Sequence, residues 1–265
     1  MNSTFFKTIT VLLFLVFMVS PCAFSGEVEV LHWWTSGGEA KSVSVLKDLL
    51  EKEGHTWQDM AVAGGAGANA MTVLKSRAVS GNPPTAAQVK GPQIQQWGDE
   101  GVLTNLDDVA MAADWDKLLP KVVADVMKYK GHYVAVPVNV HKINWMWVNP
   151  EVFKKSGAKI PTTWAEFETS AKKIKAAGYI PVGWGGQNWQ EATVWESIVL
   201  GVGGAAFYKK ALIDADADAL GSATMVKCFD TLRMVLGYID KDAPGRDWNL
   251  ATSMVIQGKA GMQFM

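Results

Sequence analysis

Extended and helical patterns alternate in order along the first part of this chain, and that order restricts the possible folds most strongly. Residues 27–33 alternate polar and apolar side chains, as a strand does, and residues 39–53 carry apolar side chains at helical spacing. An apolar stretch at 57–63, a helical pattern around 70–77 and a short apolar run at 85–89 follow. Because strands and helices alternate, the sequence predicts an α/β domain with a mostly parallel sheet.

A second lobe is predicted from two adjacent strand patterns. Residues 133–137 and 143–148 have strand character, with a proline and no helix between them. Such a break favours a crossing between lobes, so we expect a first lobe at 26–137 and a second lobe at 138–258. We expect 259–265 to begin a return crossing to the first lobe.

The segments between and after these strands are rich in helical patterns. Thr163 and Glu166 have the spacing of a capping box, in which each side chain meets the other's backbone amide. A strand is predicted at 179–182. Helices are predicted at 92–100, 106–119, 149–156, 163–177, 190–200, 222–238 and 248–257.

The N-terminus has the pattern of a secretory signal peptide. Lys7 is the only charged residue of this segment, and the apolar run at 9–19 is too short to span a membrane. Small residues up to Ser25 match a signal peptidase site, so residues 1–25 are expected to be removed on export. A lipid anchor on Cys22 is the alternative, although Pro21 fits such a site poorly.

The composition excludes some classes of partner and favours others. The formal net charge of −1 becomes −2 when Lys7 leaves with the signal peptide, so nucleic-acid binding is not predicted. Of the two cysteines, Cys228 remains, and its apolar surroundings predict a buried small hydrophobic side chain. Twelve tryptophans are unusual, because Trp is used where one face packs and another meets a ligand.

Known enzyme motifs give little support for catalysis in this sequence. The sequence contains no Gly-x-Ser-x-Gly and no His-Glu-x-x-His, and its four histidines are scattered, so neither catalytic residues nor a metal site is predicted. Gly65, Gly67 and Ala70 match the glycine pattern of a dinucleotide site. The acidic residue expected about 20 positions later is absent. The glycines are interpreted as allowing a tight turn, and no cofactor is predicted.

A glycosidase would need two carboxylates that flank a bound sugar. Glu191 and Glu196 lie near several tryptophans. Five residues on a helix turn the second side chain by about 140° from the first, so one helix face cannot present both. They are interpreted as surface or lining groups.

Trp33 and Trp34 follow the first predicted strand directly and form the strongest candidate for a binding site. Ligands of open α/β sheets bind outside the carboxyl ends of the strands, and an indole face stacks well on the apolar face of a pyranose. Neighbouring residues of a strand point to opposite faces, so at most one of the two indoles packs in the core. Glu39 either contacts the ligand or completes a capping box with Ser36, and the two roles can coexist.

Lys90 ends the predicted strand at 85–89. If the strands are parallel, it lies at the same edge of the sheet as the two tryptophans. A charged donor there can hydrogen-bond to sugar hydroxyls, and such bonds are stronger than neutral ones. A solvated loop lysine is the alternative.

Four segments taken together resemble one family of transport receptors. Residues 32–39, 63–75, 81–84 and 136–141 are similar to the periplasmic glucose- and mannose-binding proteins of proteobacterial ABC importers, within solute-binding family 1. The resemblance runs from about Glu27 to the end. It implies a two-lobed periplasmic-binding-protein fold of type II, with a hinge between the lobes.

The resemblance also implies which residues bind the ligand. In these receptors the sugar stacks on tryptophan rings and is held by acidic, basic and amide side chains from both lobes. Trp184 and Gln187 enter as candidates from the Gly183–Gln187 segment, and His141 from the hinge-like segment. The implied sugar contacts are Trp33, Trp34, Glu39, Lys90, His141, Trp184 and Gln187.

By resemblance, the function is that of a monomeric periplasmic receptor. It would close around a monosaccharide, glucose foremost, and deliver it to an inner-membrane ABC permease, with a chemoreceptor as a further partner. A secreted carbohydrate-active hydrolase is the alternative. Chains of this family continue well past Met265, so the resemblance implies C-terminal truncation and the loss of later sugar contacts.

Overall fold

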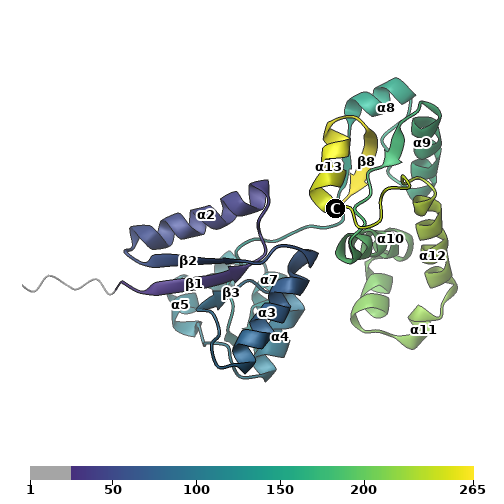
Figure 1. Cartoon of the computed structure of the whole chain (residues 1–265). Helices are drawn as coiled ribbons and strands as arrows, with labels where there is room; N and C mark the ends of the chain where they lie inside the picture. The colour runs from purple at the N-terminus through teal and green to yellow at the C-terminus, as the bar shows by residue number, and fades with distance from the viewer. Residues whose placement is uncertain (1–24) are drawn as a thin grey trace, which may run out of the picture. The chain divides into compact units, whose positions relative to one another are not determined.

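The computed structural model describes residues 25–265 (Figure 1). The predicted signal peptide therefore lies outside the described residues, apart from Ser25. The chain forms two compact units, which divide between Leu103 and Thr104 and are described separately below. The lobe boundary predicted after residue 137 marks the place of a hinge between lobes. The division into compact units does not test for a hinge, so this boundary stays a prediction.

The first unit is built on a parallel sheet with the strand order β2-β1-β3. The alternating pattern of β1 puts Leu31 at the centre of the sheet, fully buried, while Glu27 is exposed. The predicted β-α-β-α-β order and its parallel pairing are confirmed. The strands are β1 (Glu27–His32), β2 (Thr56–Ala61) and β3 (Ala86–Ala87), and the helices are α2 (Gly37–Lys52), the 3₁₀ turn Gly65–Gly67, α3 (Ala68–Val79) and α4 (Gly91–Asp99).

The two faces of this sheet are covered unequally. Figure 1 shows α2 above the sheet, with α3 and α4 below it. Leu31 packs with Ala70 and Leu74 of α3 in a small core, whereas α2 has no buried residue. Arg77 of α3 reaches back to β1 and donates two hydrogen bonds to the Glu29 carboxylate, at 2.6 and 2.8 Å. The helix below the sheet is therefore held by both apolar contact and a bidentate ion pair.

The second unit begins with a small helical cluster and a hairpin. The predicted helix at 106–119 is wrong, because Asp114 has a left-handed backbone with φ of 55° and divides it. The predicted strand at 133–137 shortens to the end of a hairpin whose Tyr133 packs with Ala110 and Ala124. These elements are α5 (Asp107–Ala112), α6 (Trp115–Leu118), α7 (Lys121–Val126), β4 (Lys128–Tyr129) and β5 (His132–Tyr133).

The main sheet of the second unit is mixed, with the order β6-β8-β7. β8 (Ala260–Phe264) lies in the middle, parallel to β7 (Ile180–Val182) and antiparallel to β6 (Met146–Val148). The predicted strand at the end of the chain is thus confirmed as a strand. Its destination in a first lobe stays a prediction.

Helices surround this mixed sheet, and most lie where the periodic patterns predicted them. The helical pattern at 190–200 is part of a longer helix, and the 217–220 turn was not predicted. The helices are α8 (Pro150–Ser156), α9 (Trp164–Ala176), α10 (Asn188–Tyr208), the π turn Lys209–Ile213, α11 (Ala217–Leu220), α12 (Ala223–Leu236) and α13 (Trp248–Ile256).

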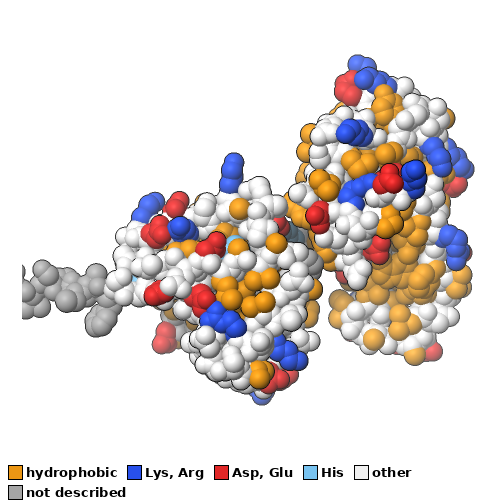
Figure 2. All heavy atoms as spheres, in the orientation of Figure 1, with side chains coloured by type: hydrophobic (Ala, Val, Ile, Leu, Met, Phe, Trp, Pro, Cys, Tyr) orange, Lys and Arg blue, Asp and Glu red, His pale blue; other side chains and the backbone are white. Residues whose placement is uncertain are grey.

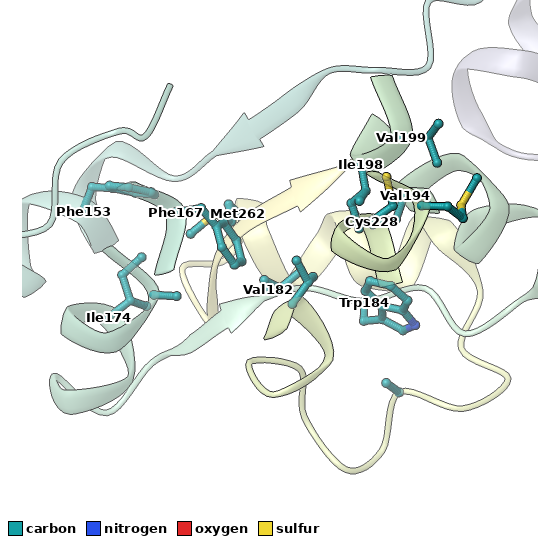
Figure 3. Close-up of a cluster of buried hydrophobic side chains, with 14 of the residues drawn as sticks. Phe153, Phe167, Ile174, Val182, Trp184, Val194, Ile198, Val199, Cys228 and Met262 are labelled. Atoms are coloured by element: carbon teal, nitrogen blue, oxygen red, sulfur yellow. The ribbon is translucent and has the colours of Figure 1, made fainter. Parts of the chain in front are cut away.

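The core of the second unit is the larger of the two. Phe167 and Ile174 of α9 and Met262 of β8 belong to one cluster of buried side chains, which Figure 3 shows in close-up. Cys228 of α12 is fully buried on the other side of the same cluster, and burial raises the pKa of its thiol. The prediction that Cys228 is a buried small hydrophobic side chain is confirmed.

The capping box predicted at the start of α9 forms in a modified way. The Thr163 hydroxyl accepts from the Glu166 amide at 3.2 Å, as predicted. The Glu166 carboxylate, however, accepts from the amide and hydroxyl of Thr162, both at 2.8 Å, one residue before the predicted partner. The helix start is stabilised all the same, because both side chains satisfy donors at its first turn.

We predict that Asn149 stabilises the second unit through two separate contacts. Its Oδ1 accepts from the amides of Glu151 and Val152 at the start of α8, and its Nδ2 donates to the Val255 carbonyl of α13 at 2.7 Å. Asn149→Ala should lower the free energy of unfolding by about 2 kcal/mol, since a cap and a hydrogen bond are lost. Asn149→Asp, which keeps only the cap, should lose about half as much. Urea denaturation at pH 7 measures both.

Asn249→Ala provides the control, because this exposed side chain on α13 bonds only to the next residue's amide. Its effect should stay within about 0.5 kcal/mol. Equal losses in the alanine and aspartate variants of Asn149 would show that the α8 cap contributes nothing.

Candidate functional site

The carboxyl ends of three parallel strands meet at one edge of the first unit. β1 is followed by Trp33 and Trp34, β2 leads toward Gly64–Gly67, and β3 leads toward Lys90. The prediction that Lys90 lies at the same sheet edge as the tryptophans is confirmed by this pairing. Ligand sites of open α/β sheets form at such edges.

Trp33 is half-buried, and contacts with the other two strand ends hold it in place. Its amide donates to Oε1 of Gln88, which follows β3, at 3.2 Å. Its ring lies so close to Gly67 that an added Cβ there would stand 2.9 Å from two ring carbons. Gly67 has a left-handed backbone with φ of 97°, so a glycine is needed on both counts. Part of the indole stays exposed to solvent.

Trp34 packs inward and is only 5% exposed. Its amide donates to Nδ1 of His32 at 3.2 Å, and Nε2 of His32 lies 2.6 Å from Oδ1 of Asp59 on β2. Trp33 is the more exposed of the pair, yet it packs against the core of Leu31, Ala70 and Leu74. The expectation that at most one of the two indoles packs in the core is therefore not confirmed.

Glu39 lies in the first turn of α2, and its carboxylate accepts from the Ser36 hydroxyl at 2.8 Å. The Ser36 side chain makes no bond to the helix backbone, so the capping box considered from the sequence is not formed. A half-buried carboxylate held by a hydroxyl can still accept hydrogen bonds from a ligand.

Lys90 precedes α4 and has an exposed side chain. Its amide donates to Oε1 of Gln93 at 3.2 Å, which fixes the backbone at the start of that helix. Lys90 thus leads into α4 at the sheet edge that holds the indoles.

The predicted residues of the second unit lie in the turn between β7 and α10. Trp184 is 4% exposed and belongs to the hydrophobic core, where Figure 3 shows its indole near Val182. Gly186 permits this turn to run against another loop, because an added Cβ would stand 2.0 Å from the Ala243 carbonyl oxygen. The turn is therefore fixed by backbone packing.

Gln187 is the centre of a polar network just before α10. Its Nε2 donates to Oδ1 of Asp247 at 2.5 Å, and its Oε1 accepts from Nε1 of Trp189 at 2.8 Å and from Nε2 of Gln190 at 3.0 Å. An amide with this many partners has a well-defined orientation. His141 lies in a different place, exposed and within an irregular segment that precedes β6.

Arg246 and Asp240 brace the loop against which Gly186 packs. The guanidinium donates to both carboxylate oxygens of Asp240, at 2.5 and 2.7 Å, and to the Trp184 carbonyl at 3.1 Å. Both side chains are mostly buried, 12% and 15% exposed. The hydrogen bonds from Arg246 hold the pKa of the Asp240 carboxyl below its ordinary value.

An apolar hollow of about 570 Å³ lies elsewhere in the second unit, between α10 and α12. Figure 2 shows hydrophobic side chains gathered over this part of the surface. Trp195 and Phe229 stack there with ring centroids 4.6 Å apart, and Glu191 is the charged residue of the lining. A neutral sugar needs several convergent polar groups, which the strand ends offer and this hollow does not.

The two glutamates considered for a glycosidase have different surroundings. Glu196 accepts from the Tyr208 hydroxyl at 3.0 Å, whereas Glu191 is exposed.

Within residues 25–265, no three His, Cys, Asp or Glu side chains gather closely enough to hold a metal ion. In the same range, no helix has the length and apolar character needed to cross a membrane.

Some residues that shape the site were not predicted. Gln88, His32 and Asp59 hold the main chain around the indoles, yet each is an ordinary polar residue beside a strand end. Asp240 and Arg246 lie far in sequence from the turn that they support. The glycine-rich segment at 64–67 was the sequence feature that could have indicated this part of the site. Its proximity to Trp33 depends on how the strands pair.

Comparison with known proteins identifies similar sequences. The sequence profile of bacterial extracellular solute-binding proteins matches residues 34–265. A probable sugar-binding periplasmic protein of Brucella melitensis is 51% identical over 238 residues, which are 90% of this chain and 56% of that protein. One from Rhizobium meliloti is 48% identical over 260 residues, 98% of this chain and 63% of that protein. The chain thus spans less than two thirds of the length of these relatives.

Solved structures share the fold at low identity. A bacterial solute receptor with an exclusive preference for β-D-galactopyranose matches with a TM-score of 0.73 and 22% identity, over 91% of this chain and 60% of that one. A receptor solved in complex with raffinose matches with a TM-score of 0.69 and 20% identity, over 89% and 61%. The predicted fold class, that of two-lobed periplasmic binding proteins, is confirmed by these matches.

We predict that the Asp240–Arg246 pair makes the second unit sensitive to acid. Because the folded pKa of Asp240 is depressed, the pair stabilises the fold fully above the unfolded pKa of about 3.9 and loses this effect as pH falls further. Asp240→Asn should cost about 3 kcal/mol at pH 7, since a mostly buried guanidinium loses its partner. Denaturation between pH 3 and 7 should show a weaker acid dependence in this variant.

Asp230→Asn is the matched control. Asp230 pairs with Arg233 at 2.7 Å, but the two side chains are 61% and 77% exposed. The loss should be below about 0.5 kcal/mol. If both variants lose the same stability, the buried pair has no special role.

Proposed function

Because the chain belongs to the family of bacterial extracellular solute-binding proteins, we propose that it is the periplasmic receptor of an ABC importer and binds a monosaccharide. The names of the relatives from Brucella and Rhizobium, which are called probable sugar-binding periplasmic proteins, support this class of ligand.

One observation carries the proposal: a half-buried indole, a carboxylate and a lysine side chain share the carboxyl edge of a parallel sheet. These groups belong to Trp33, Glu39 and Lys90. The indole provides a flat apolar surface for the C–H face of a pyranose, while the carboxylate accepts from sugar hydroxyls and the ammonium donates to them. A charged ligand is not required by this set, because it contains one group of each sign.

The remaining predicted contacts are proposed with roles that fit their burial. Trp34 and Trp184 are mostly buried, so each is proposed to reach the sugar with a ring edge and to support its neighbours by packing. Gln187 is proposed as a hydrogen-bonding amide, because its network fixes its orientation. His141 is proposed as a contact from the irregular segment before β6.

Glucose is the ligand that we propose first. In the chair form of its β-anomer all hydroxyls are equatorial, so both ring faces present C–H groups to an aromatic side chain. A hydroxyl whose partner is missing costs about 1–3 kcal/mol, which is enough to separate epimers. The bound form is proposed to dock on an inner-membrane permease, with a chemoreceptor as a second partner and without a cofactor.

We predict that Trp33→Ala and Lys90→Met each weaken glucose binding. Removing the stacking surface should cost about 1–3 kcal/mol of binding free energy, and removing the ammonium about 1–2 kcal/mol. Lys90→Met should lower the free energy of unfolding by less than about 1 kcal/mol, because the lysine side chain is exposed. Trp33→Ala should lower it by about 1–3 kcal/mol, because the half-buried indole packs against the core of Leu31, Ala70 and Leu74. Calorimetric titration with glucose and urea denaturation measure the two quantities.

Lys52→Met is the matched control, since Lys52 is an exposed lysine of the same unit at the far end of α2. It should leave glucose affinity unchanged. Incubation with aryl glycosides separates the receptor from a hydrolase, because release of the aglycone would overturn the non-enzymatic proposal. Unchanged affinity in both site variants would remove the sheet edge as the binding site.

A further inference from the structure

We propose that His32 is a positioning residue of the sugar site, which holds the main chain of Trp34 through its Nδ1 atom. This inference rests on the proposed function, because it assigns a role next to the indoles at the edge of the sheet. His32 was not among the predicted contacts, and its side chain is only 6% exposed, so it has little direct access to a ligand.

The two ring nitrogens of His32 have partners of opposite kinds. The Trp34 amide can only donate, and it lies 3.2 Å from Nδ1. The Asp59 carboxylate can only accept when ionised, and its Oδ1 lies 2.6 Å from Nε2. Nδ1 must therefore be bare and Nε2 must carry the proton.

This arrangement works only with a neutral imidazole of one tautomer. If Nδ1 carried the proton, two donors would face each other, and the Trp34 amide would lose its acceptor. Asp59 favours the tautomer that carries its proton on Nε2, because the carboxylate accepts a hydrogen bond from Nε2–H. Asp59 also accepts from Nε1 of Trp57 at 3.4 Å, so its own orientation is supported within β2.

The position of His32 explains why a side-chain acceptor is needed there. At the end of β1 the ladder stops, with the His32 carbonyl accepting from the Val62 amide at 2.8 Å. The next two amides leave the ladder, and both find side-chain acceptors, Gln88 for Trp33 and His32 for Trp34. A pair of side chains thus replaces the missing strand and fixes the residues that carry the indoles.

Two substitutions separate this role from a merely structural one. In His32→Asn, the amide oxygen lies near the place of Nδ1 and can accept from Trp34, while the contact with Asp59 is lost. In His32→Gln, the amide nitrogen lies near the place of Nε2 and can donate to Asp59, while Nδ1 has no replacement. If positioning through Nδ1 matters, the asparagine variant resembles the unmodified chain and the glutamine variant does not.

The first test needs no substitution. In the purified, ¹⁵N-labelled chain at pH 7, the imidazole nitrogens of His32 should show the shifts of a neutral ring with a bare Nδ1 and a protonated Nε2. The signal is assigned by its absence from His32→Asn. A proton on Nδ1 would overturn the proposal directly.

The second test compares amide exchange and affinity in the two variants. Hydrogen exchange of the Trp34 amide should be about tenfold faster in His32→Gln than in His32→Asn, and glucose affinity about tenfold weaker, in line with one lost hydrogen bond. Thermal unfolding should be similar in both variants. Equal exchange and equal affinity would overturn the role of Nδ1.

Failure of the proposed function would look different. If the unmodified chain bound no glucose while Trp34 exchange still differed between the variants, the receptor proposal would fall and His32 would keep only its effect on the backbone. If the unmodified chain bound glucose and the two variants bound it equally well, the receptor proposal would stand and the positioning role would be withdrawn.

Discussion

Parallel pairing of β1 with both of its neighbours decides where the chemistry of the first unit lies. Six residues of β1 pair in register with β2, and two pair with β3, all in the same direction. Each strand therefore releases its chain at the same edge, and each is followed by a helix that begins there. If one of these strands ran the other way, the tryptophans, the glycine turn and Lys90 would lie at opposite edges. Every local contact of the proposed site depends on this shared direction.

Close packing then fixes the positions of the residues that meet at these strand ends. The Trp33 ring lies so close to Gly67 that a side chain at position 67 would not fit. In the same way, Gly186 in the turn after β7 lies too close to the Ala243 carbonyl for a side chain at position 186. Where the backbone leaves a strand, its amides are taken up by side chains such as Gln88 and His32. Steric demands and obligatory hydrogen bonds thus act together, because a strand end that carries a bulky indole has few low-energy positions.

The sequence supported the order of elements better than the details of the site. Strands and helices up to residue 100 could be predicted, since period-2 and period-3.6 patterns follow one another there without interruption. The division of the 106–119 helix at Asp114 could not, because a left-handed residue leaves no mark in hydrophobic periodicity. The common edge of Trp33 and Lys90 followed from strand direction. The burial of Trp34 and Trp184 could not be predicted, since it depends on which elements cover each ring.

Networks made of distant polar residues were the least predictable part. Gln187 could be proposed by resemblance, but its contact with Asp247 joins residues 60 positions apart. The Arg246 contact with the Trp184 carbonyl spans 62 positions. No local propensity encodes such pairs, and only the folded chain brings them together.

The central place of β8 has a consequence for how the second unit is made. β6 and β7 do not pair with each other, and both bind β8, which comes more than 75 residues after β7 in the chain. On a ribosome, the two earlier strands must wait with unpaired edges until Ala260–Phe264 has left the exit tunnel. Helices α8 to α13 can gain local structure during that interval, but the sheet closes late and over long sequence separations.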